Sequence, residues 1–441
     1  MKNKYLYILI GIFAFSSCNL EPNLDASFNE TDVWKDRDYA MGVLNESYRG
    51  LYAFYSDEYG GFLDCATDNA VTNNFNSSLI TAATGGLRAD ANPINSWKKC
   101  YSQIKNLNEF IEKSPHISFS NDNKTNEVIH QRVKGESYFL RAWYQFELLS
   151  RFAGLDDNQN LLGYPMVVSV LKDDEIRNVP RSKFDECVAQ IEKDLAVAIE
   201  HLPEDQYSGN DIVLGETQTG RAYLLPALSL RSRLLLYAAS PADTVKKTDV
   251  EKQKLWEDAA IASMDVIKKA GSLPSIPVNG SLYTNPNHAE VIWRSFQPEN
   301  NKPEKENFYP SLWGNGRTNP SQQLVDAFPM KDGYPIDQST NYDASNPYTG
   351  RDNRFGLTVV HNAATFGKDV VETFVGGKDY PAPGVERGTR TGYYLRKFLD
   401  PTITLSPDEA VATVKHYYAF FRKGEIWLNY SEAANEAWGQ M

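Results

Sequence analysis

The feature that most constrains this chain is a succession of segments whose apolar residues are spaced as in α-helices. The clearest segment runs from Arg181 to Leu202, where the apolar residues step by four, three, four, three and four positions: Phe184, Val188, Ile191, Leu195, Ala198 and Leu202. This spacing places them on one face of a helix. Ser182, followed three positions later by Asp185, predicts a capping box at the start of that helix.

Similar patterns occur through the first 270 residues and predict further helices over 32–55, 97–111, 128–152, 219–239 and 251–270. Between the first two of these, residues 56–95 are rich in Gly and Asn and are expected to form an ordered loop. Successive helices of this length favour antiparallel pairs that stack as tetratricopeptide units do, although a repeat of about 34 residues is not evident. We therefore predict a mainly α fold with a scaffold of tetratricopeptide-like helix pairs over about 30–270.

The pattern changes over residues 271–415, where Pro, Gly and Asn interrupt the chain frequently. Short apolar runs at 290–294 and 356–361 predict a few short strands in this loop-rich half. Helical signals return from His416 to Ala437, so we expect 416–441 to rejoin the scaffold. Because that last helix has no following partner, we expect the full protein to continue beyond residue 441.

The first residues have the layout of a secretory signal. Lys2 and Lys4 precede an uncharged run, which closes on Ser16-Ser17-Cys18. The run is shorter than the roughly 20 residues that a membrane-spanning helix needs. A cysteine after two small residues is typical of bacterial lipoproteins, so we predict a signal peptide over residues 1–17 and a lipid anchor on Cys18. The alternative is an ordinary signal peptide with an incidental cysteine.

Composition excludes several classes of function. The chain has 441 residues, of which 45 are basic and 57 acidic, giving a net charge of −12. Nucleic acid is not an expected partner, since binding to phosphates requires a basic face. The three cysteines after Cys18 show no CxxC spacing, and the sequence has no HExxH, P-loop or dinucleotide-binding motif. We therefore predict no metal and no cofactor.

Five stretches, taken together and in this order, resemble the SusD/RagB family of Bacteroidetes outer-membrane lipoproteins. They are residues 135–144 (GESYFLRAWY), 179–182 (VPRS) leading into 191–195 (IEKDL), 320–328 (PSQQLVDAF) with Asp332-Gly333, 346–352 (NPYTGRD) with Arg354-Phe355, and 422–435 (RKGEIWLNYSEAAN). The resemblance extends over nearly all of the chain after the signal peptide. It implies a single domain from residue 18 to 441.

The resemblance also implies a role. Proteins of this family are lipid-anchored at the outer membrane, face the cell exterior, bind a glycan or oligosaccharide, and deliver it to a SusC-like TonB-dependent transporter without catalysis. Two alternatives remain open at this stage. One is a peptide- or protein-binding lipoprotein on the same scaffold, since helix-pair arrays commonly bind peptides. The other is a surface glycosidase, which would need a pair of carboxylates at the scissile bond.

A glycan site of this kind needs aromatic rings that stack on sugars, together with amide and charged groups that bond hydroxyls. Two clusters of such residues are set among Gly, Pro and Asn. The first contains Phe308, Tyr309, Trp313, Asn315 and Arg317, and the second contains Asp68, Asn73, Asn74 and Phe75. We predict that these residues contact the ligand, the alternative being that the rings fill the core of the loop-rich half. The stretch from Arg351 to Arg354 is instead expected to have an architectural role and not to contact the ligand.

Overall fold

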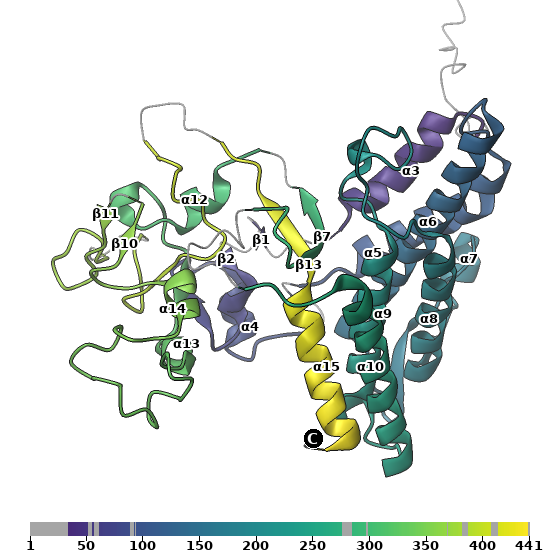
Figure 1. Ribbon diagram of the computed structural model, residues 1–441. Coiled ribbons are helices and arrows are strands. Elements are labelled where there is room, and N and C mark those ends of the chain that lie inside the picture. Colours follow the sequence, from purple (N-terminus) through teal and green to yellow (C-terminus); the bar gives the residue numbers. More distant parts are fainter. Residues whose placement is uncertain are drawn as a thin grey trace, which may run out of the picture.

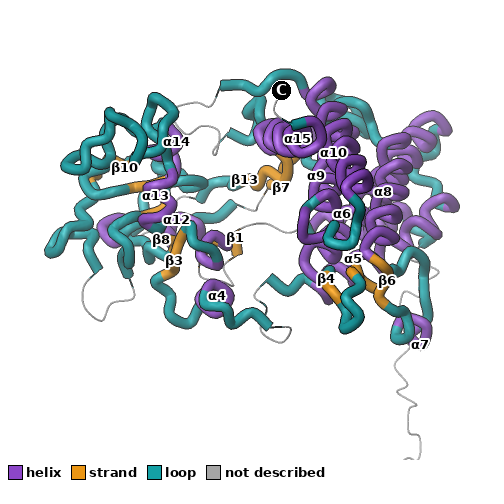
Figure 2. Tube along the Cα trace, turned by 90° about the horizontal axis from the view of Figure 1, so that it is seen from below, coloured by secondary structure: helices purple, strands orange, loops and turns teal. Residues whose placement is uncertain are grey.

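The computed structural model divides into a helical half and a loop-rich half (Figure 1). It describes residues 34–51, 55–56, 61–88, 92, 94–275, 285–296, 299–367, 369–381, 387–406 and 413–439. The predicted signal peptide and Cys18 lie outside the described residues. Figure 2 shows the long helices gathered on one side, with short strands and long loops making up most of the other side.

The helical half is an array of long helices in which neighbours in sequence are neighbours in space (Figure 1). The helices are α3 (Arg37–Arg49), α5 (Trp97–Lys113), α6 (Asn123–Phe152), α8 (Phe184–His201), α9 (Leu224–Ala239), α10 (Asp249–Ala270) and α15 (Lys423–Trp438). Contacts run from α5 to α6, α6 to α8, α8 to α9, α9 to α10, and α10 to α15. This order confirms the prediction of a mainly α fold built from tetratricopeptide-like helix pairs.

Helix α6 lies at the centre of the array and is buried on several faces. Phe139, Leu140 and Trp143 are among its core residues. The core also holds an ion pair between Arg141 and Asp194 of α8, whose two hydrogen bonds measure 2.8 and 2.7 Å. A bidentate pair of this kind fixes the register of two helices, because both charges would be unpaired if one helix slid along the other.

The predicted capping box at Ser182 and Asp185 is wrong. Residues Arg181–Lys183 form strand β6, which pairs with β5 (Leu161–Pro165), and the helix begins at Phe184. The carboxylate of Glu186 accepts a hydrogen bond of 3.1 Å from the backbone N–H of Lys183. The strand pairing fixes Ser182 in extended backbone, so the helix starts later than the sequence pattern indicates.

The loop-rich half is held by short antiparallel strand pairs rather than by one large sheet. The pairs are β1 (Tyr55–Ser56) with β2 (Gly61–Phe62), β3 (Ala70–Thr72) with β8 (Thr318–Pro320), β9 (Val359–Val360) with β12 (Tyr394–Leu395), and β10 (Thr365–Phe366) with β11 (Asp369–Val370). Its short helices are α4 (Ser78–Ala83), α12 (Lys302–Asn307), α13 (Gln322–Ala327) and α14 (Asn353–Thr358). In the helical half, β4 (Gly154–Leu155) pairs with β5 in a sheet of order β4-β5-β6, and α7 (Asp173–Ile176) lies between β5 and β6 in the chain.

Residues 61–88 belong to the loop-rich half, although the sequence places them inside the predicted scaffold range. Strand β3 in this segment pairs with β8, and Val71 lies opposite Asn319. The expected ordered loop therefore contains short strands and a short helix. Pairing across about 250 positions leaves no periodic signal in either segment, so sequence patterns could not indicate it.

Residues 417–422 form a strand, which corrects the prediction that a helix starts at His416. Strand β13 (Tyr417–Arg422) pairs antiparallel with β7 (Val291–Phe296), and α15 follows directly (Figures 1 and 2). Aromatic residues favour strands when a partner strand is present. The predicted strand at 290–294 is confirmed within β7, whereas residues 356–358 of the other predicted strand lie in α14.

The stretch around Arg351 has the architectural role that was expected. Arg351 is buried, and its guanidinium donates to the backbone oxygens of Val325 and Phe328 at the end of α13. Arg354 pairs with the carboxylate of Asp352, at 2.8 Å. The arginine therefore satisfies carbonyl groups that a helix end leaves without intrahelical partners.

Candidate functional site

The pairing of β3 with β8 brings the two predicted site clusters together. Thr72 lies opposite Thr318 in this ribbon, so Asn73 comes next to Arg317. The Nδ2 group of Asn73 donates to the backbone oxygens of Asn315 at 2.7 Å and Gly388 at 2.9 Å. Its Oδ1 accepts a hydrogen bond of 3.1 Å from Arg317. One buried amide thus joins three segments of the loop-rich half.

The polar members of the two clusters mainly hold one another. Asn315 and Arg317 both donate to the carboxylate of Glu306, at 3.2 Å each. Both donors of the Asn73 amide and its oxygen have partners within the protein. The geometry therefore supports a role in positioning the surrounding loops, and direct contact of these three residues with a ligand stays a prediction.

Phe308 and Tyr309 are not exposed rings, which corrects the expectation that they stack on a ligand. Each is only 1% exposed. Their rings pack against Phe366, and that of Tyr309 also packs against Tyr394. They form the core of the loop-rich half because the chain folds back over them, and burial rather than sugar contact explains their place in a Gly- and Asn-rich segment.

Trp313 is 53% exposed, as the prediction requires, and its backbone has a left-handed φ of 65°. Trp313 does not line the cavity of about 500 Å³ that opens beside Asn73.

The remaining two residues of the second cluster lie apart from each other. Asn74 accepts a hydrogen bond of 3.1 Å from the backbone of Asn76 and forms a turn. Asp68 lies at the other end of β3, where its backbone oxygen accepts a bond from Ser321. The structure thus separates Asp68 from the other residues of its cluster.

A cavity of about 500 Å³ opens beside Asn73. It is lined by Asn73, Phe75, Tyr380, Pro381, Gly388, Thr389, Arg390, Thr391 and Gly392. Phe75 is 60% exposed, and the guanidinium of Arg390 lies 4.3 Å from the centre of its ring. Tyr380 supplies a second exposed ring. This volume is within the usual range of small-molecule sites.

The 388–392 loop at this cavity is fixed by hydrogen bonds. The backbone N–H groups of Thr389 and Arg390 donate to Tyr394 at 2.9 Å and to Asn319 at 3.1 Å. Gly388 has a φ of 98°, and a Cβ atom there would come within 3.1 Å of Pro381, so glycine is needed. The loop is therefore organised before any ligand arrives, which lowers the entropic cost of binding.

Sequence reasoning missed Tyr380 and Arg390. The same signal that singled out Trp313, an aromatic residue among Gly and Pro, also occurs at Tyr380 next to Pro381. No sequence signal indicates Arg390, because its position over Phe75 depends on the β3–β8 pairing and the Asn73 contact with Gly388. Two exposed rings and a guanidinium group at one cavity can bind a planar or hydroxyl-rich ligand.

Two family models match the chain. One is described as "Starch-binding associating with outer membrane" and matches residues 32–224, and the model of the SusD family matches residues 287–440. The chain belongs to the SusD/RagB family. The two matched segments contribute Phe75 and Tyr380, respectively, to the cavity. A search of curated proteins finds no match.

Solved structures share the fold of this SusD/RagB protein. A SusD-like protein from Bacteroides fragilis is 23% identical with a TM-score of 0.72, and the match covers 94% of this chain and 78% of that one. A SusD-like carbohydrate-binding protein from the same organism is 22% identical, with a TM-score of 0.71 and coverage of 92% and 75%. Surface glycan-binding protein A from Bacteroides fluxus is 18% identical, with a TM-score of 0.59 and coverage of 91% and 76%.

Two further properties bear on function. Among the helices of the described residues, none has both the length and the apolar composition needed to cross a bilayer. Within the same part of the chain, no three His, Cys, Asp or Glu side chains are grouped so that they could hold a metal ion.

Proposed function

We propose that this protein is a cell-surface lipoprotein that binds a poly- or oligosaccharide in its loop-rich half. In this proposal Cys18 carries the lipid anchor at the outer membrane, and the bound glycan passes to a SusC-like TonB-dependent transporter without being cleaved. Membership of the SusD/RagB family supports this role, as does the glycan- or carbohydrate-binding description of two proteins with the same fold.

The observation that carries the proposal is the pair of exposed rings, Phe75 and Tyr380, at a cavity that also contains Arg390. Exposure of an aromatic ring to water costs free energy. Stacking of the apolar face of a sugar on the ring removes this surface from water and is therefore favourable. The guanidinium of Arg390 can donate to the hydroxyls that project from a sugar ring, and the backbone oxygens of residues 389–392 can accept from them. This combination suits a neutral, hydroxyl-rich ligand better than an extended apolar one.

Affinity gel electrophoresis tests this function. The protein from residue 19 onward is run through gels that contain plant, host or microbial polysaccharides, and retardation identifies the ligand. We expect Phe75→Ala and Tyr380→Ala each to weaken binding by about 10- to 150-fold, since burial of one ring contributes roughly 1.5–3 kcal/mol. Tyr334→Ala is the matched control, because Tyr334 is an exposed ring of the loop-rich half that does not line this cavity.

The outcomes separate the alternatives. Unchanged retardation in the double variant of Phe75 and Tyr380 would remove the cavity from the site and direct attention to Trp313. Competition by peptides and not by oligosaccharides would favour the peptide-binding function. New reducing ends in a mixture with polysaccharide would contradict the proposal that the protein is not catalytic. Tyr309→Ala is not a useful test, because its buried ring is part of the core.

A further inference from the structure

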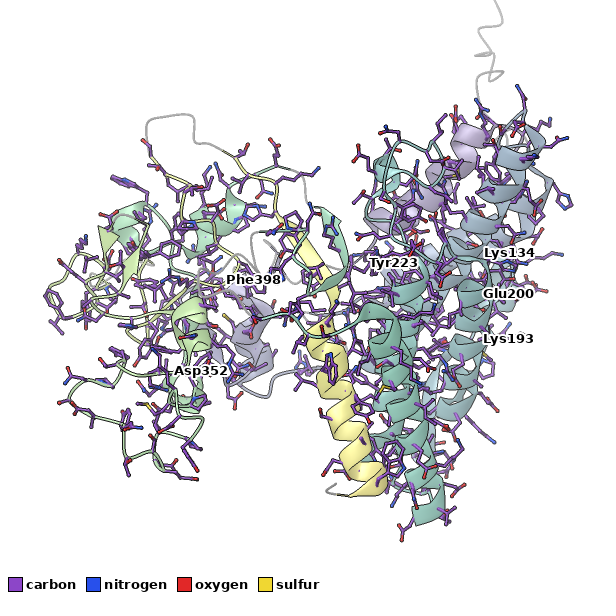
Figure 3. The ribbon with its side chains drawn as sticks, in the orientation of Figure 1. Lys134, Lys193, Glu200, Tyr223, Asp352 and Phe398 are labelled. Carbon is purple, nitrogen blue, oxygen red and sulfur yellow. The ribbon has the colours of Figure 1, made fainter. Side chains whose placement is uncertain are left out.

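A cavity of about 610 Å³ lies where the helical half meets strand β7 and the start of α15. Its wall comes from residues 204–206 after α8, from Tyr223 and Leu225 at the start of α9, from the end of α10 and from residues 286–294. Figure 3 shows Tyr223 on the side of the helical half that faces β7 and β13. The volume is within the usual range of small-molecule sites, and the residues differ from those that line the cavity beside Asn73.

The most deeply buried charged group at this cavity is Arg294 on β7, which is 5% exposed. Its guanidinium donates to Oδ1 of Asn287 at 2.7 Å, which holds it at the wall of the cavity. Burial lowers the pKa of this guanidinium, so its positive charge costs free energy in the folded protein. Burial acts in the same way on Arg233, but there the carboxylate of Glu425 outweighs it and the pKa is raised. An anion in the cavity would stabilise Arg294 as Glu425 stabilises Arg233.

Lys423 and His288 add donors to the same cavity, and both side chains are only partly buried. The ammonium of Lys423, the first residue of α15, lies 3.5 Å from the backbone oxygen of Ser272, at the limit of a hydrogen bond. Nδ1 of His288 accepts a hydrogen bond of 3.2 Å from the backbone N–H of Glu290, so the proton of the neutral ring is on Nε2. Both side chains can therefore donate to an oxyanion in the cavity.

The charge of the cavity fits a ligand with a single negative charge. Among the described residues that line it, Lys269, Arg294 and Lys423 are cationic, and Glu204 and Asp205 are anionic. Both anionic side chains are exposed, and Glu204 pairs with Lys269 at 2.8 Å. Water screens the exposed acids, whereas it does not screen buried Arg294. One negative charge on the ligand offsets the excess positive charge, and a polyanion would be repelled by Glu204 and Asp205.

We propose that this cavity binds a small organic ligand through one carboxylate group. A carboxylate accepts charge-assisted hydrogen bonds from guanidinium and ammonium groups, which are the strong ones. Leu225, Pro286 and Val291 are partly buried and supply apolar surface for the rest of the ligand. The proposal goes beyond the proposed function, since it concerns a different cavity and a ligand that need not be a sugar.

Isothermal titration calorimetry with matched acids and amides at pH 7 tests the proposal. The acids are benzoate, hexanoate, N-acetylleucine and glucuronate. Each has a neutral partner in which an amide replaces the carboxylate, namely benzamide, hexanamide, N-acetylleucinamide and glucuronamide. The protein starts at residue 19, and the ionic strength is held constant with NaCl. We expect at least one acid to bind about tenfold more tightly than its amide, or better. Absence of binding by every acid, or equal binding of each acid and its amide, would overturn the proposal.

Two lysine variants locate the binding. Lys423→Gln and Lys193→Gln each remove one positive charge, but only Lys423 lines the cavity, whereas exposed Lys193 lies on α8 (Figure 3). We expect Lys423→Gln to weaken binding of the acid by about fivefold or more, and Lys193→Gln to leave it unchanged. Equal affinity of the two variants for the acid would show that it binds elsewhere.

Arg294→Gln tests the buried cation directly. Glutamine keeps an N–H donor for Asn287 but carries no charge, so we expect binding of the acid to be lost. Thermal unfolding without ligand verifies that this variant is folded. A folded Arg294→Gln variant that binds the acid as tightly as the unchanged protein would contradict the proposal. If the variant does not fold, the comparison of Lys423→Gln with Lys193→Gln decides the outcome.

Discussion

At the scale of single residues, side chains in the loop-rich half are fixed by partners that are distant in sequence. Asn73 bonds residues 315, 317 and 388. His361 is another example: its ring stacks on Tyr348 with centroids 4.0 Å apart and lies parallel to Phe355. Its Nδ1 is 2.8 Å from the backbone oxygen of Asn362, so the proton of the neutral ring is on Nδ1.

The environment of His361 predicts a dependence of stability on pH. Burial, together with the charge of Arg396, lowers the pKa of His361 below 6.5. Between the folded and unfolded pKa values the unfolded state binds the proton, so the free energy of unfolding falls as the pH drops through 6.5. We expect His361→Phe, which keeps the stacking, to reduce the loss of stability between pH 7 and pH 5. Urea denaturation at several pH values measures the free energy of unfolding of both proteins. An equal loss between pH 7 and pH 5 in the two proteins would contradict the prediction.

At the scale of elements, close helix packing requires a glycine on α6. A Cβ atom on Gly135 would lie 2.8 Å from both the Cγ and the backbone N of Leu202, just after α8. Gly42 on α3 has no such neighbour within 4 Å. The two glycines are therefore a matched pair, in which only one is needed for packing.

Alanine at these two positions should have opposite effects. In Gly42→Ala, the higher helix propensity of alanine is expected to raise the free energy of unfolding by about 0.5–1 kcal/mol. In Gly135→Ala, overpacking of about 1–3 kcal/mol should outweigh that gain and lower stability. Urea denaturation followed by circular dichroism measures both. Equal stabilisation of the two variants would mean that α6 and α8 separate without cost.

At the scale of the whole molecule, an aromatic cluster connects the β7–β13 ribbon to the helical half. The ring of Trp293 on β7 lies 5.4 Å from Trp143 on α6 and 4.4 Å from Phe420 on β13. Its indole N–H donates to the backbone oxygen of Gly220 at 2.9 Å. Because α15 follows β13 directly, this cluster also fixes where α15 begins.

Trp293→Ala should therefore be strongly destabilising. Loss of a buried tryptophan is expected to lower the free energy of unfolding by about 3–5 kcal/mol. Trp438→Ala, at an exposed position near the end of α15, should change it by about 0.5 kcal/mol or less. Chemical denaturation compares the two. Similar small effects would show that the ribbon contributes little to joining the halves.

The sequence predicted the helical half well, because helix-forming patterns are local. The apolar stripe from Phe184 to Leu202 predicted α8 to within one residue of its end at His201. The order of the long helices in the chain predicted which helices pack against each other. The predicted start of that helix was wrong because residues 181–183 pair with β5. The predicted helix from His416 was wrong because residues 417–422 pair with β7, and strand pairing overrides local propensity. Phe75, Phe308 and Tyr309 were all predicted to contact the ligand, yet Phe75 is exposed at a cavity whereas Phe308 and Tyr309 are buried, since residue type alone does not distinguish a core ring from an exposed one.

The sequence by itself determined the mainly α class, the loop-rich segment and the resemblance to the SusD/RagB family, because each depends on residues close together in the chain. Only the tertiary structure decided which rings are exposed and which side chains meet. Asn73 comes next to Arg317, and Phe75 lies beneath Arg390, through the pairing of β3 with β8 across about 250 positions. Contacts over that distance depend on the closure of long loops and on burial in three dimensions, which leave no periodic trace in the sequence.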